Sequence, residues 1–270
     1  MPCAPEMWTG CAPRVDGAGR SGEFRTRNKS ERTGWPVAEA MAFEDRSAWS
    51  LSGVEAIADR SGALYLPGER VLAVADLHFE KGSAFAAKGV FLPPYDTRAT
   101  LTRLAEVIAR LKPRTLIALG DSFHDLGADG RMDEADADTL AALVRSVADW
   151  VWIEGNHDPV PPPRFGGSIA GEASLGPLTF RHEPAGGVGE VAGHLHPCAK
   201  VSGNGRTLRA RCFASDGNRA VLPSFGAFTG GLNVRDAAFA KVFGCCPDAW
   251  VIGRRTVYPI AARRLLPDRR

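Results

Sequence analysis

The sequence has no run of 18 consecutive apolar residues, so no helix is expected to span a membrane. An apolar stretch behind a basic start is also missing at the N-terminus, so we expect no secretory signal. The six cysteines contain no CxxC pair, which argues against a zinc site built from paired cysteines. Without an export signal, we expect reduced thiols and a cytoplasmic protein.

An overall excess of one charge is lacking too, because 33 Lys and Arg face 31 Asp and Glu and leave a net charge of +2. The charge is unevenly distributed. Residues 254–270 carry +5 and residues 1–40 carry +1, which leaves −4 for residues 41–253. The basic C-terminal tail at residues 263–270 either contacts a polyanion or is a solvated, frayed terminus.

Residues 1–40 are rich in Gly, Pro, Arg, Glu and Ser and show no hydrophobic periodicity. This composition predicts a disordered extension. Residues 41–262 are expected to form one folded domain, since a 270-residue chain with 44% hydrophobic residues can bury one substantial core.

Five short apolar runs stand out, and each ends in polar residues. The runs are predicted to be buried strands at residues 71–75, 115–119, 150–153, 178–180 and 190–192. The polar residues that follow them include Asp76, His78, Asp121, Asn156, His182, His194 and His196.

Helical periodicity lies between the strands. Apolar residues from Leu101 to Leu111 share one helical face, and Pro113 ends that segment. A second helix is marked by Leu140 to Val147, behind acidic residues that favour a helix start. The alternation predicts an α/β fold, in which ligands bind at the carboxyl ends of the strands.

After residue 200 helical periodicity is largely absent. The sequence there predicts a second, mostly antiparallel sheet, built from strands and turns at residues 207–213, 220–223 and the Gly-rich residues 225–233.

All six histidines lie in or just beyond the strand-end clusters. A single His at a strand end is more often structural, but six of six beside two Asp and one Asn favour a metal site. Two cations about 3.5–4 Å apart can neutralise a phosphodiester and activate water. With only Asp76 and Asp121 as carboxylates, two divalent ions leave a charge of about +2, which favours an anionic substrate. Asp121, alone at its strand end, is the natural bridge between them.

The chain resembles the calcineurin-like metallophosphoesterase superfamily over roughly residues 71–228, on five motifs in order. They are Asp76-x-His78, Gly120-Asp121, Gly155-Asn156-His157-Asp158, His182 and Gly193-His194-x-His196. The resemblance implies a four-layer α-β-β-α sandwich with two mixed sheets. It also implies a two-metal phosphodiesterase in which a metal-activated hydroxide attacks the phosphorus.

The same resemblance implies a role for each residue. The first metal would be bound by Asp76, His78 and His196, and the second by Asn156, His182 and His194, with Asp121 between them. His157 would contact the phosphate and act as general acid toward the leaving oxygen, since imidazole titrates near working pH. Asp158 would orient His157. Asp125 either supports the metal centre or caps a loop.

A narrower resemblance is to the PdeM family, bacterial metallophosphoesterases associated with a DNA ligase, an exonuclease and a helicase in a DNA-repair gene group. It rests on residues 76–82, 84–85, 88–89, 92–97 and 222–231. In addition, Gly120-Asp121-Ser122-Phe123-His124 is similar to a loop of double-strand-break repair nucleases, whose extra histidine lies near DNA. The resemblance therefore implies a DNA endonuclease with His124 near the substrate and those three repair proteins as candidate partners.

Carboxylate, imidazole and carboxamide ligands suit Mn²⁺, which the resemblance favours, and also Fe²⁺ or Zn²⁺. Candidates for contacts with the DNA backbone are Lys81, Lys88 and Arg98, which follow the first metal motif. Three arginines of one predicted strand either line a DNA path or form an ordinary exposed face. They are Arg206, Arg209 and Arg211.

Two other functions stay open. The same fold can act on a small nucleotide or a cyclic nucleotide, because the metal cage would be shared. A non-catalytic scaffold in a repair complex is the second, although all seven expected ligands are present. The domain has no dense basic patch, so tight sequence-specific DNA binding is not expected. Nothing in the sequence sets an oligomeric state.

Overall fold

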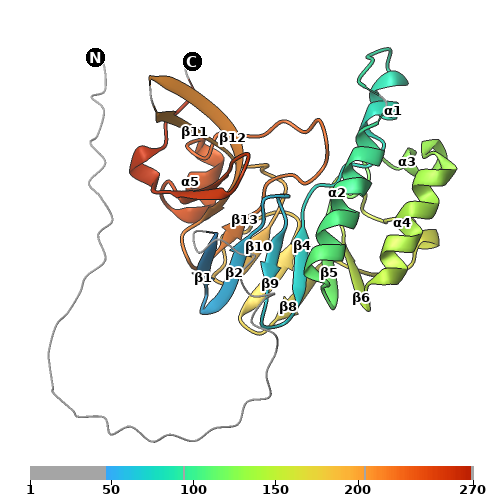
Figure 1. The fold of residues 1–270 in the computed structure, drawn as a ribbon, viewed down its shortest axis with the longest axis horizontal. Coiled ribbons are helices and arrows are strands. Elements are labelled where there is room, and N and C mark those ends of the chain that lie inside the picture. Colours follow the sequence, from blue (N-terminus) through green and yellow to red (C-terminus); the bar gives the residue numbers. More distant parts are fainter. Residues whose placement is uncertain (1–46, 94, 204, 269–270) are drawn as a thin grey trace, which may run out of the picture. The chain divides into compact units, whose positions relative to one another are not determined.

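Two β-sheets and the helices on their outer faces make up the fold (Figure 1). The computed structural model describes residues 47–93, 95–203 and 205–268. The extension expected at residues 1–40 therefore lies outside the described residues. Among the described helices, none combines the length and the apolar character that crossing a bilayer requires.

The first sheet has the strand order β1-β2-β3-β4-β5-β6-β7. Its strands are β1 (Ala48–Leu51), β2 (Val54–Ala58), β3 (Leu64–Leu66), β4 (Val71–Val74), β5 (Thr115–Leu119), β6 (Asp149–Ile153) and β7 (Ser168–Ala170). Strands β1 to β4 pair antiparallel, and β4 to β7 pair parallel. The parallel half places the carboxyl ends of β4, β5 and β6 at one edge of the sheet.

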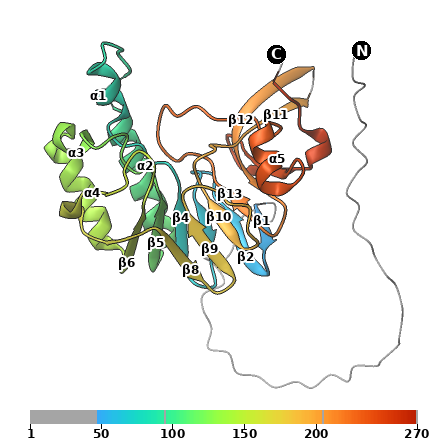
Figure 2. The same ribbon diagram turned by 180° about the vertical axis from the view of Figure 1, so that it is seen from behind.

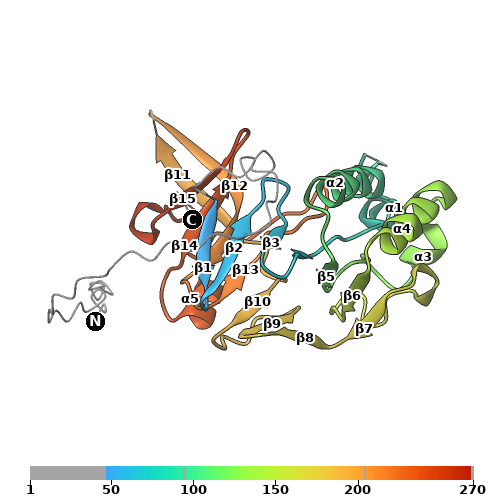
Figure 3. The ribbon, with the colours of Figure 1, turned by 60° about the horizontal axis from the view of Figure 1, so that its bottom comes forward.

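The second sheet has the order β15-β14-β12-β13-β10-β9-β8, with β11 paired to β12. Its strands are β8 (Glu172–Leu175), β9 (Leu178–Arg181), β10 (Glu190–Ala192), β11 (Cys198–Gly203), β12 (Arg206–Ser215), β13 (Ala220–Val221), β14 (Asp248–Ile252) and β15 (Val257–Ile260). Only β10 pairs parallel with its two neighbours, β9 and β13. Figure 3 shows the β11–β12 hairpin extending from this sheet.

The helices cover the two outer faces. They are α1 (Lys81–Ala86), α2 (Asp96–Leu111), α3 (Ala128–Arg131), α4 (Glu134–Ser146) and α5 (Ala237–Phe243), with short 3-10 turns η2 (Pro163–Phe165) and η3 (Ala262–Arg264). Figures 1 and 2 show α2 and α4 on one side of the sheets and α5 on the other. The four-layer α-β-β-α sandwich with two mixed sheets is confirmed.

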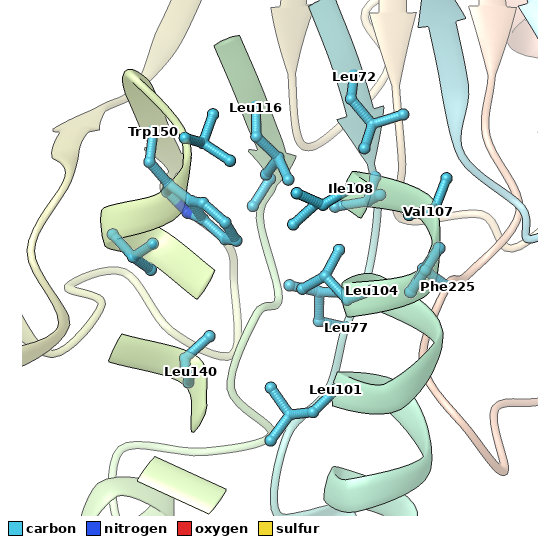
Figure 4. Packing of buried hydrophobic residues seen from close by; sticks show 14 of the residues in the cluster. Leu72, Leu77, Leu101, Leu104, Val107, Ile108, Leu116, Leu140, Trp150 and Phe225 are labelled. Atoms are coloured by element: carbon cyan, nitrogen blue, oxygen red, sulfur yellow. The ribbon is translucent and has the colours of Figure 1, made fainter. Parts of the chain in front are cut away.

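Three apolar clusters hold the layers together. Leu101, Leu104 and Ile108 of α2 pack against Leu72 and Leu116 of the first sheet (Figure 4). A second cluster fills the space between the sheets, and a third packs α5 on the second sheet. Both predicted helices are therefore present, and their apolar faces are buried as the periodicity indicated.

The C-terminal half contains a loop and a helix that the sequence did not distinguish. The Gly-rich residues 225–233 contain no strand, and isolated bridges lie at Ser224 and Asn233. Gly226 lies so close to the chain that a Cβ there would be 2.2 Å from the Leu77 carbonyl oxygen, so this segment packs as a loop. Helix α5 was not predicted, because its 7 residues are too few to show a periodicity.

The basic tail is also folded as far as residue 268. Leu265 is buried in the third cluster, and the Leu266 amide donates to the Lys200 carbonyl at 2.8 Å. Asp268 lies 3.4 Å from Arg209 and 4.0 Å from Lys200. The interpretation of a frayed terminus is therefore wrong for residues 263–268.

Phe180 tests the packing between the sheets, because it is fully buried in the second cluster on β9. We expect Phe180→Ala to lower the free energy of unfolding by about 3–5 kcal/mol, since it leaves a large cavity. Urea denaturation measures this change. Phe91→Ala is the matched control because Phe91 is 86% exposed, and it is expected to change stability by less than about 0.5 kcal/mol. Equal effects of the two substitutions would contradict the assigned core.

Candidate metal centre

The structure brings all seven predicted ligands together at the strand ends. Asp76, His78 and His196 form one group, and Asp121, His182 and His194 form a second; within each group the ligand atoms lie within 4.8 Å of one another. Asn156 joins the second group through its side-chain contacts with two histidines. Each group combines residues that follow strands of the first sheet with residues that follow strands of the second.

The second group has the spacing of a coordination shell. Asn156 Oδ1 lies 2.9 Å from His182 Nε2 and 3.1 Å from His194 Nδ1, and the two ring nitrogens are 3.2 Å apart. Asp121 Oδ1 is 3.4 Å from His182 Nε2. Ligands that bind one ion at about 2.0–2.2 Å are separated by roughly these distances at ordinary coordination angles.

Hydrogen bonds fix which ring nitrogen of two histidines faces the ligand groups. His182 Nδ1 lies 2.9 Å from the Leu119 carbonyl oxygen, and His196 Nδ1 lies 3.2 Å from the Gly230 carbonyl oxygen. A carbonyl can only accept, so each Nδ1 carries the proton. In the neutral ring, Nε2 then presents a lone pair, as metal-bound histidines do.

Asp76 anchors the first group. Its Oδ1 is 3.2 Å from His196 Nε2, and both carboxylate oxygens accept from the His194 amide, at 3.2 and 3.0 Å. Asp76 is fully buried and His78 is 5% exposed. A buried carboxylate among imidazole lone pairs fits a bound cation, so the donor set suits two divalent ions.

The pKa values reflect the crowding of these groups. Burial lowers the pKa of His78 to about 2, and the neighbouring His196 adds to this effect. Burial also acts to lower the pKa of His182, but the hydrogen bond to Asp121 and the charge of Asp76 outweigh it and raise the pKa to about 9. A cation would therefore compete with a proton on His182.

The backbone at the ligands is mostly left-handed. Five of the seven have positive φ, in a conformation that non-glycine residues seldom adopt. They are Asp76 (53°), His78 (46°), Asp121 (46°), His194 (66°) and His196 (45°). Strained backbone of this kind concentrates at functional sites, where the surrounding structure holds it in place.

The glycines of the GD and GN motifs have a steric reason. A Cβ at Gly120 would lie 2.5 Å from the His182 ring, and a Cβ at Gly155 would lie 2.1 Å from the Asp121 amide nitrogen. Each glycine thus lets a ligand of another segment approach. The glycines of these two motifs are therefore explained by close contacts between neighbouring strand ends.

His157 lies beside both groups, but Asp158 does not orient it as expected. His157 Nδ1 is 2.8 Å from the His124 carbonyl oxygen, and its Nε2 is 3.9 Å from Asp121 Oδ2. Asp158 instead accepts from the Phe123 amide at 3.0 Å, and burial raises its pKa to about 7. The backbone of His124 therefore orients the His157 ring, and Asp158 holds the loop that carries this carbonyl.

The ring of His124 stacks on His157, with centroids 5.2 Å apart. Burial lowers the pKa of His124, and the charges of His157 and Lys81 add to this effect. Lys81 is thus close enough to influence this part of the centre. Asp125 accepts from the Gly127 amide and from Arg131, so it caps a loop rather than supporting a ligand.

Three of the arginines that were candidates for DNA contacts bind other residues of the protein. Arg98 pairs with Asp136 at 2.9 Å and Asp133 at 3.5 Å on the neighbouring α4 segment. Arg209 donates to the Gly231 carbonyl and lies 3.4 Å from Asp268. Arg211 is not part of an exposed face, because it is partly buried and donates to the Ser224 carbonyl at 2.7 Å. Arg206 of the same strand is exposed, and its side chain has no such contact with the residues that the structure describes.

A cavity of about 310 Å³ opens beside the second group. Asn156 and His182 of the second group line it, together with Glu154, Arg181, Glu183, Pro159 and two glycines. Sequence reasoning missed this cavity, since it forms where residues beside two distant motifs meet, and that meeting depends on tertiary packing.

Metal titration tests the two groups separately. We expect the full chain to bind two Mn²⁺ ions, His196→Ala to lose the first site, and His182→Ala to lose the second, because each variant removes one ligand from one group only. Isothermal titration calorimetry gives the stoichiometry, and Val160→Ala, an exposed position, is the control. A wild-type stoichiometry of zero would contradict both sites.

Comparison with known proteins agrees with this geometry. Residues 69–218 match the calcineurin-like phosphoesterase family. The crystal structure of the Pseudomonas putida nuclease MPE is similar, with 30% sequence identity and a TM-score of 0.62 over 80% of this chain and 100% of that chain. The search of curated proteins found no match.

Two further solved structures show weaker similarity. One is AQ665, a protein of unknown function from Aquifex aeolicus, with 18% sequence identity and a TM-score of 0.31 over 43% of this chain and 61% of that chain. The other is the phosphoesterase Yfce from E. coli, with 13% sequence identity and a TM-score of 0.34 over 71% of this chain and 98% of that chain. The family match alone spans more than half of the chain. The protein therefore belongs to the calcineurin-like phosphoesterase family.

Proposed function

We propose that the protein is a metal-dependent phosphodiesterase that cleaves DNA, acting as an endonuclease. The observation that carries the proposal is the pair of ligand groups with His157 beside them. Family membership supports phosphoester hydrolysis, and the similarity to the nuclease MPE supports a nucleic acid as substrate. The PdeM-like segments of the sequence support a role in bacterial DNA repair, with a ligase, an exonuclease and a helicase as candidate partners.

The proposed centre holds two divalent ions, with Mn²⁺ as the preferred ion and Asp121 between the two. When bound, they would neutralise the phosphate and activate the attacking water. Asp121 is suited to this place because burial, which raises the pKa of its carboxyl, is outweighed by the hydrogen bonds from His182 and the His157 amide together with the charges of His182 and His78, and the pKa falls to about 2. The carboxylate therefore stays ionised and available at any physiological pH.

His157 is the proposed proton donor. The His124 carbonyl holds a proton on Nδ1, which leaves Nε2 of the same ring to carry a second proton toward the leaving oxygen. The ring is partly exposed, with 41% of the side chain accessible, so a substrate can reach it. Lys81, beside His124, is the proposed contact to a neighbouring phosphate.

His157→Ala tests the proton donor. We expect kcat toward bis-p-nitrophenyl phosphate with Mn²⁺ to fall about 10²–10⁴-fold, with Mn²⁺ binding retained, because His157 is not a ligand. Val160→Ala is the control, since it is an exposed side chain on the same loop. An unchanged kcat in His157→Ala would reject the assigned role.

A comparison of substrates tests the nuclease proposal. Purified protein with Mn²⁺ is expected to nick plasmid DNA and to hydrolyse bis-p-nitrophenyl phosphate. Agarose gels and absorbance follow the two reactions, and Asp121→Ala serves as the inactive control. Hydrolysis of the small diester with intact plasmid at high enzyme concentration would instead identify a small nucleotide as substrate. No hydrolysis of either would support a non-catalytic scaffold.

A further inference from the structure

The loop at residues 224–226 runs beside the first metal ligand. Ser224 forms an isolated parallel bridge with Ala75, and the Phe225 amide donates to the Ala75 carbonyl at 2.7 Å. The Asp76 carbonyl accepts twice, from Ser224 Oγ at 2.8 Å and from the Gly226 amide at 3.1 Å. None of the three loop residues, Ser224, Phe225 and Gly226, belongs to either ligand group.

Asp76 has little freedom in this environment. Its φ is 53°, its amide donates to the Gly120 carbonyl at 3.3 Å, and its carboxylate accepts from the His194 amide. The two bonds from the loop fix the remaining polar group, the carbonyl. A left-handed residue that is held at its amide, carbonyl and side chain presents its carboxylate in one position.

Two arginines hold the loop from its other side. Arg211 Nη1 donates to the Ser224 carbonyl at 2.7 Å, and Arg103 Nη1 donates to the Phe225 carbonyl at 2.6 Å. Arg103 also lies over the Phe225 ring, 5.4 Å from its centroid. Figure 4 shows Phe225 among the apolar residues between α2 and the first sheet.

The arginines are unusual because they are partly buried and no described carboxylate forms a salt bridge with either of them. Burial lowers the pKa of both guanidinium groups, and the charge of Arg103 lowers the pKa of Arg211 further. Removing a charge from water is unfavourable unless strong hydrogen bonds replace the solvent. The two consecutive carbonyls supply those bonds, so the loop and the arginines stabilise one another.

We propose that Ser224, supported by Arg103 and Arg211, is a positioning residue for the first metal ion and acts through Asp76. The hydroxyl fixes the Asp76 carbonyl, and the arginines keep the hydroxyl in place. The affinity of the first site then depends directly on a loop from the C-terminal half of the chain, whereas the second site is linked to that loop only through the bond from the His194 amide to Asp76. The proposal rests on the candidate metal centre and makes no assumption about the substrate.

Ser224→Ala tests the proposal by Mn²⁺ titration of the full chain. The ion of the first site, which is the one lost in His196→Ala, is expected to bind about 10–100-fold more weakly, because residues that orient a metal ligand typically contribute this much to affinity. The ion of the second site is expected to keep its affinity within about twofold. In a diesterase assay, the Mn²⁺ concentration for half-maximal rate should rise by the same factor, with kcat at saturating Mn²⁺ preserved.

Ser215→Ala is the matched control. Ser215 is also fully buried, and its hydroxyl donates to the Arg219 carbonyl at 2.8 Å, the same distance as the Ser224 bond. It has no contact with Asp76, so it is expected to lose similar stability in thermal unfolding and to bind both ions as the wild type does. This comparison separates positioning of Asp76 from general loosening of the sheet.

Arg103→Met gives a second variant if Ser224→Ala does not fold, because it keeps an apolar stem over Phe225 and removes the bond to the loop. It should weaken the first ion in the same direction. Unchanged affinity of the first ion in a folded variant, or equal weakening of both ions, would overturn the proposal. Because the readout is metal binding, failure to cleave DNA would overturn the proposed substrate and leave this inference standing.

Discussion

The face-to-face packing of the two sheets is the constraint on which the metal centre depends. Ile117 and Leu119 of β5 meet Phe180 of β9 and Phe213 of β12 in one buried cluster. Each ligand group takes residues from both sheets, so neither group can assemble until this apolar interface forms. Burial of large side chains between the sheets therefore determines how the polar ligands beyond the strand ends are placed relative to one another.

Backbone hydrogen bonds also connect the turns that carry the ligands. The His78 amide donates to the Asp121 carbonyl at 2.9 Å, and the Gly193 amide donates to the His182 carbonyl at 3.0 Å. A left-handed conformation costs a non-glycine residue on the order of 1–3 kcal/mol, and these bonds keep the residues of the turns in that conformation. The site is thus a network of backbone contacts on which the side chains are placed.

The sequence predicted the residues of the metal centre better than their support. Apolar runs and the polar residues behind them are local patterns, so the strands and the seven clustered residues could be found. Contacts between distant segments leave no such pattern. The His124 carbonyl that orients His157, the ion pairs of Arg98 and the bond from Arg211 to Ser224 all depend on tertiary packing. Helix α5 was missed because it is short.

The division of each ligand group between two sheets has a consequence for how such a chain can lose activity. A bound ion would join segments that are far apart in the sequence, such as those of Asp76 and His196, and so act as a cross-link that closes a long loop. A substitution of one ligand would then remove both the catalytic activity and the cross-link that the bound ion provides. Relatives that abandon catalysis are therefore expected to need compensating apolar contacts between the sheets.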